Sequence, residues 1–94
     1  MFDLDGAWRL DERTSLRPER FGALLYHFGT RRLSFLTDPS LVSLVLALAE
    51  QPTARAACAA AGVSPADLPR YRRALAALAA SGMILPEERA HGAG

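Results

Sequence analysis

The apolar side chains between residues 21 and 36 are spaced around a turn in a way that predicts a β-hairpin. The turn is the Gly29-Thr30 pair, because glycine in the first turn position is typical of a two-residue type II′ connection. This placement sets the register, so that one face carries Leu24, Tyr26, Phe28, Leu33 and Phe35. Since that face is almost wholly apolar, we expect the helices downstream to cover it.

The opposite face of the hairpin is mixed, and we expect it to be half exposed to water. It carries Ala23, Leu25, His27, Arg32, Ser34 and Leu36. Because a lone hairpin is only marginally stable, a third strand is expected beside it, and Thr14–Arg17 is the candidate. Trp8–Leu10 is expected to pack as a cover or as a short strand.

Start and stop signals predict three helices in the second half of the chain. The first has Asp38 as its N-cap and Pro39 in its first turn, and it runs to about Glu50. The second begins at Thr53 and ends at Gly62.

The third helix is expected to start at Asp67, with Pro69 in its first turn. Its apolar stripe, at helical spacing, is Leu68, Tyr71, Leu75, Leu78 and Gly82. After the helix, residues 83–85 are expected to be extended. The order of elements predicts a small α+β domain of winged-helix type, with an N-terminal three-stranded antiparallel sheet packed on three helices.

Length and composition agree with one small soluble domain. All 94 residues form a single domain, with its core at about residues 8–86 and a disordered tail at 87–94. The longest apolar run, residues 41–49, has half the length that a membrane helix needs. The N-terminus shows no secretory signal, so a cytoplasmic location without membrane contact is expected.

Charge and candidate chemistry argue against an enzyme. All eleven basic residues are arginines, which excludes lysine chemistry, and the net charge of +1 is low for a DNA-binding domain. His27 is expected to be a partly exposed structural histidine, and His91 lies in the tail. The single cysteine, Cys58, is expected to be a small buried apolar residue. We therefore expect no catalytic residue, no metal site and no cofactor.

The arginines gather in two places, at Arg31 and Arg32 in the hairpin turn and at Arg70, Arg72 and Arg73 on the third helix. They are either a solvated surface, a nucleic-acid contact or an anchor for an acidic or extended peptide.

The last hairpin strand favours the peptide. If Thr14–Arg17 pairs on the far side, this strand has an open edge, and from Leu33 onward it carries neither charge nor proline. Such an edge is what peptide binding by strand addition requires. The expected contacts are Arg31, Arg32, Leu33, Ser34, Phe35, Leu36, Tyr71, Arg72, Leu75 and Leu78.

The hairpin string FGALLYHFGTRRLSFL, with Trp8-Arg9-Leu10 before it and three helices after it, resembles the mycofactocin precursor peptide chaperones. They belong to the RiPP recognition elements, a family typified by the pyrroloquinoline quinone peptide chaperone. The resemblance covers about residues 8–86, and the hairpin is its most specific part.

This resemblance implies a non-catalytic chaperone for mycofactocin biosynthesis. It would bind the leader of a ribosomally made precursor peptide as an added strand, between the third strand of the sheet and the third helix. It would then present the peptide to a radical S-adenosylmethionine (radical SAM) maturase, and it would be a monomer or a weak homodimer that binds no nucleic acid. The alternative is a winged-helix DNA-binding regulator.

Overall fold

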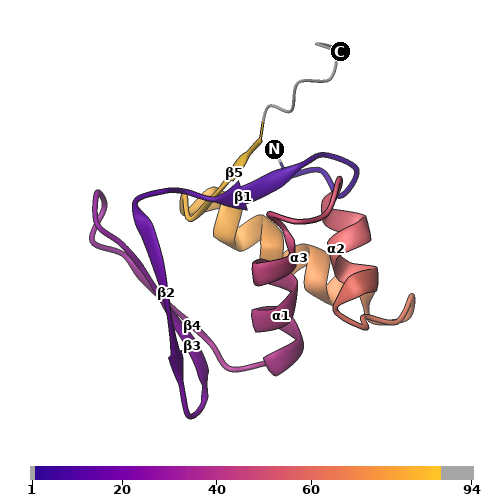
Figure 1. Cartoon of the computed structure of the whole chain (residues 1–94), viewed down its shortest axis with the longest axis horizontal. Helices are drawn as coiled ribbons and strands as arrows, with labels where there is room; N and C mark the ends of the chain where they lie inside the picture. Colours follow the sequence, from indigo (N-terminus) through magenta and orange to yellow (C-terminus); the bar gives the residue numbers. More distant parts are fainter. Residues whose placement is uncertain (1, 88–94) are drawn as a thin grey trace.

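The computed structural model describes residues 2–87, which form two small sheets beside three helices (Figure 1). The elements are β1 (Trp8–Leu10), β2 (Thr14–Glu19), β3 (Gly22–His27), β4 (Leu33–Leu36), α1 (Pro39–Ala47), α2 (Ala54–Ala60), α3 (Leu68–Ala80) and β5 (Ile84–Pro86). The expected α+β class, with a three-stranded antiparallel sheet and three helices, is confirmed. Residue 88 onward, which includes most of the expected tail and His91, lies outside the described residues.

The three-stranded sheet has the order β2-β3-β4, and the predicted hairpin register is confirmed, with Tyr26 opposite Leu33. The turn itself differs from the prediction. The Arg31 N–H donates to the His27 carbonyl at 2.7 Å, and Arg31 has the positive φ of 62°, so the connection is longer than two residues. Gly29 does not have the positive φ that a type II′ turn demands of it.

The prediction of which sheet face is covered is wrong. The helices pack on the face of Ala23, Leu25 and Leu36, which are at most 3% exposed. The opposite face, predicted to be covered, leaves Phe28 57% and Phe35 63% exposed. The helix-covered face is called the inner face below, and the other the outer face. His27 lies on the inner face and is 2% exposed, so the expectation of a partly exposed histidine is also wrong.

The helices begin where their caps predict. The Asp38 carboxylate accepts from the Ser40 N–H at 2.9 Å, and the Thr53 hydroxyl accepts from the Ala56 N–H at 3.0 Å. Asp67 precedes α3 without a side-chain cap bond. Leu44 and Leu48 of the α1 region and Leu75 of α3 are at most 1% exposed, so these helices supply the centre of the core.

The two ends of the described chain meet in a second sheet, in which β1 pairs antiparallel with β5. Figure 1 shows these two strands side by side, away from the three-stranded sheet. The Asp11 N–H extends the contact by donating to the Met83 carbonyl at 2.9 Å. The N-terminal strand therefore lies against β5, and it does not occupy the edge of β4. Within residues 2–87, no helix combines the length and apolarity needed to cross a bilayer.

Candidate functional site

The outer edge of β4 carries unpaired backbone groups. The His27 N–H donates to the Arg32 carbonyl at 3.0 Å, so this residue pair is a hydrogen-bonded one. Bonded and non-bonded pairs alternate along an antiparallel ladder, which makes Leu25 and Ser34 the next bonded pair. The N–H and C=O groups of Leu33 and Phe35 therefore point away from β3, and they have no backbone partner elsewhere in residues 2–87.

The other edge of the three-stranded sheet, along β2, is better protected than the edge of β4. The Phe28 N–H donates to the Arg13 carbonyl at 2.8 Å, and alternation from that pair turns Thr14, Leu16 and Pro18 outward. The Thr14 N–H is bonded to the Asp11 carbonyl and proline has no N–H to offer, so Leu16 is the one of the three whose outward N–H has no backbone partner within residues 2–87. Such protection is how proteins prevent unwanted strand pairing, and the edge of β4 lacks it.

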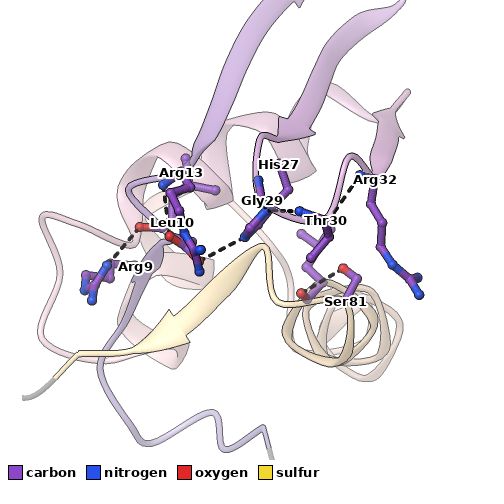
Figure 2. Close-up of polar contacts among 10 residues, drawn as sticks. Arg9, Leu10, Arg13, His27, Gly29, Thr30, Arg32 and Ser81 are labelled. Atoms are coloured by element: carbon purple, nitrogen blue, oxygen red, sulfur yellow. Dashed lines mark hydrogen bonds and ion pairs between the residues drawn. The ribbon is translucent and has the colours of Figure 1, made fainter.

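The loop that leads into β4 is held by a buried histidine (Figure 2). The His27 Nδ1 atom accepts the N–H groups of Gly29 and Thr30, each at 3.0 Å. Its Nε2 atom lies 3.0 Å from the Asp11 carboxylate, which is also buried. Because Nδ1 accepts two hydrogen bonds, the proton sits on Nε2 and is donated to Asp11.

Asp11 is arranged to stay ionised. The backbone N–H of Arg13 donates to it at 2.9 Å, and this bond, followed by the one from His27, lowers the pKa of Asp11 from 3.8 to about 2. The Asp11–His27 pair therefore ties the hairpin loop to the segment between β1 and β2. The sequence carried no signal for this pair, because the two residues are sixteen positions apart and one lies outside any predicted element.

The other end of β4 is fixed by Asp38. Besides capping α1, its carboxylate accepts a hydrogen bond from the Tyr71 hydroxyl of α3. The bond from Tyr71 is the largest cause of the lowered pKa of Asp38. Arg70 lies 4.6 Å from the centre of the Tyr71 ring and 3.5 Å from Asp38, which joins the start of α3 to the end of the sheet.

The predicted contact residues fall into two groups. Arg31, Arg32, Leu33, Phe35 and Arg72 are exposed, and Ser34 is half-buried. Leu36, Tyr71, Leu75 and Leu78 are buried in the core. Leu33 and Phe35 also lie on the outer face, so the structure does not bring their side chains together with those of α3. What it does bring together at one edge is the outward backbone of β4.

Candidate chemistry elsewhere in the described residues is sparse. Cys58 is buried, as predicted, and burial raises the pKa of its thiol, which keeps it protonated and unreactive. No group of three or more histidine, cysteine, aspartate or glutamate side chains within residues 2–87 is placed to hold a metal ion.

A small α+β domain whose distinctive feature is an unprotected strand edge has the form of a binding domain. The sequence matches the Peptide chaperone MftB family over residues 7–85, and the chain belongs to this family.

Three mycobacterial proteins named peptide chaperone MftB are close in sequence. The one from Mycobacterium ulcerans is 51% identical over 87 residues, covering 93% of this chain and 80% of its own length. The one from Mycobacterium tuberculosis is 49% identical with the same coverage. The one from Mycolicibacterium smegmatis is 51% identical over 85 residues, covering 90% of this chain and 83% of its own. No solved structure matches the chain.

The family resemblance expected from the hairpin is thereby confirmed. The relatives are named as chaperones, a non-catalytic role, and this confirms the expectation that the chain is not an enzyme.

Proposed function

We propose that this peptide chaperone binds the leader of a ribosomally made precursor peptide as a fourth strand along β4. It then presents the peptide to a radical SAM maturase in mycofactocin biosynthesis. The observation that carries the proposal is the outward backbone of Leu33 and Phe35, on an edge of the three-stranded sheet that no proline or bonded neighbour within residues 2–87 protects.

The geometry suits a short extended guest. Two outward residues in a four-residue strand offer two N–H donors and two C=O acceptors. Arg31 and Arg32 stand exposed at the start of β4 and can contact acidic residues that flank the guest. The core residues Leu36, Tyr71, Leu75 and Leu78 hold β4 and α3 in place beneath this surface.

A pair of substitutions at Phe35 separates backbone from side-chain binding. Phe35→Ala removes the exposed ring and keeps the outward N–H, whereas Phe35→Pro removes both. We expect Phe35→Pro to bind a fluorescent leader peptide about tenfold or more weakly than Phe35→Ala, since it loses a donor that the guest strand uses. The measurement is a fluorescence anisotropy titration.

Circular dichroism must first show that both variants keep the fold. The outward N–H of Phe35 makes no bond to β3, so proline is tolerated there better than at Ser34, whose N–H faces Leu25. Equal affinity of folded Phe35→Pro and Phe35→Ala variants would reject strand addition at this edge.

A further inference from the structure

The large apolar side chains that are exposed to water gather on one face of the molecule. Among the described residues, five large hydrophobic side chains are exposed, and four of them are Phe21, Phe28, Leu33 and Phe35. Leu24 and Tyr26 lie directly opposite Phe35 and Leu33 in the sheet and complete the same surface. These six residues are called the outer patch.

The rings of the outer patch pack on one another and leave their outward sides bare. Phe21 and Phe35 have centroids 5.8 Å apart, and Tyr26 and Phe28 have centroids 5.5 Å apart. The helices pack on the other side of the sheet, so they leave this surface uncovered. A contiguous exposed apolar surface of this kind marks an interaction site on a soluble protein.

Charges at the margin indicate what fits the patch. Exposed Arg20 lies in the turn beside Phe21, exposed Arg31 lies in the loop at the opposite end of the hairpin, and Arg17 lies opposite Leu24 on the same face. The acid on the β2 side of this face, Glu19, is already paired with Arg17 at 3.0 Å. A second copy of the chain would place this arginine-rich margin against itself, whereas a partner with acidic groups around an apolar centre would complement it.

The patch is continuous with the edge of β4. Leu33 and Phe35 belong to both, their side chains to the patch and their outward backbone to the edge. A guest strand paired with β4 would direct every second side chain onto the same face and so enlarge the patch. Peptide binding and partner docking would then share one surface.

We propose that the outer patch is the surface on which a partner protein with an apolar, acid-rimmed face docks, and that it does so best when a peptide strand extends the patch. The inference rests on the proposed function, in which that partner is the maturase. It assigns to docking a face distinct from the helix-covered inner face.

The test uses two exposed aromatic residues that lie off β4. The double variant Phe21→Ser/Phe28→Ser removes apolar area from the patch and leaves the backbone of Leu33 and Phe35 unchanged. Its matched control is Leu46→Ser, because Leu46 is 54% exposed on α1 and lies outside the patch. Binding of each chain to the cognate purified maturase is measured by biolayer interferometry, with and without saturating precursor peptide.

We expect the double variant to bind the maturase about tenfold or more weakly than wild type and to retain peptide affinity within about twofold, since only docking area is lost. Leu46→Ser should match wild type in both assays. Arg20→Glu should weaken maturase binding more than Arg73→Glu, an exposed control on α3.

Unchanged maturase binding by the folded double variant would overturn the inference, as would a wild-type chain that binds peptide but not maturase. The inference would also be overturned if the wild-type chain sediments as a dimer and the double variant, but not Leu46→Ser, sediments as a monomer. The patch would then bind a second copy of the chain. If the wild-type chain does not bind the precursor peptide, the proposed function is rejected. The inference about the outer patch is then still decided by comparing maturase binding of the double variant with that of wild type.

Discussion

At the scale of single residues, His27 connects packing to the candidate site. It is buried, its Nδ1 accepts the N–H groups of Gly29 and Thr30, and its Nε2 donates to Asp11. Within residues 2–87, no other side chain accepts a hydrogen bond from those two loop N–H groups. The imidazole therefore fixes the Gly29-Thr30 part of the loop before β4.

We expect His27→Leu to lower the free energy of unfolding by about 2 kcal/mol, because two loop N–H groups and a buried carboxylate lose their partner. His27→Asn should lose less, since an asparagine oxygen can accept from the backbone N–H two residues on. Urea denaturation measures the difference, and the amide shifts of Gly29 and Thr30 report the loop. Equal stability of the two variants would contradict this role for the imidazole.

The surroundings of some single residues follow from the sequence alone. Cys58 stands in an alanine-rich helix, and its burial could be predicted from that setting alone. The contact of His27 with Asp11 could not, because it depends on where the chain between β1 and β2 crosses the hairpin end. The pairing of Thr14 with His27 places Asp11 beside the imidazole, and the sequence pattern does not determine that register.

At the scale of secondary-structure elements, Asp38 joins β4, α1 and α3. It follows the last residues of the sheet, caps α1 through the Ser40 N–H and accepts from the Tyr71 hydroxyl. The capping role could be predicted from the Asp38-Pro39 pair, but the bond to Tyr71 could not.

Asp38→Ala should destabilise the fold by about 1–2 kcal/mol, the usual effect of losing an N-cap carboxylate. Tyr71→Phe keeps the cap and removes the hydroxyl that donates to Asp38 and accepts from Arg70, so it should be the milder change. Thermal unfolding followed by circular dichroism checks the order. Because Asp38→Ala loses both the cap and the Tyr71 bond, a Tyr71→Phe variant as unstable as Asp38→Ala would place the main contribution in the helix contact and not in the cap.

The hairpin shows why a correct register does not settle which face is buried. The spacing of residues 21–36 predicts which side chains share a face, and the structure confirms that partition. Both faces, however, carry large apolar residues, Leu25 and Leu36 on one and Tyr26 and Phe35 on the other. The choice between them is made by the helices, which pack against Ala23, Leu25 and Leu36, and the spacing within the hairpin does not contain that choice.

At the scale of the whole molecule, the three-stranded sheet is joined to the rest by contacts distant in sequence. β1 pairs with β5, which brings the two ends of the described chain together. Asp11, directly after β1, donates its N–H to the Met83 carbonyl and accepts from His27 through its carboxylate. Strands of three residues carry too little pattern to predict such pairing, although both segments were expected to be extended or to pack as cover. Because the N-terminal strand pairs with β5, it does not cover the edge of β4, which stays free within residues 2–87.

Asp11 gives the fold a specific response to acid. Its pKa in the folded state is about 2 against an ordinary value of 3.8, so its carboxylate stabilises the fold fully above about pH 4. That contribution is lost as the pH falls from about 4 to about 2. We expect Asp11→Asn to unfold in urea with a shallower pH dependence than wild type across this window. Parallel curves for the two proteins would contradict the assignment.

The central claim is that the outward backbone of β4 receives a peptide strand, and amide hydrogen exchange tests it within one strand. In the free chain, the N–H groups of Leu33 and Phe35 face outward, whereas that of Ser34 is directed at β3. Saturating leader peptide should slow exchange at Leu33 and Phe35 by about tenfold or more and change Ser34 far less. If Leu33 and Phe35 exchange at the same rate with and without bound peptide, the peptide does not pair with this edge.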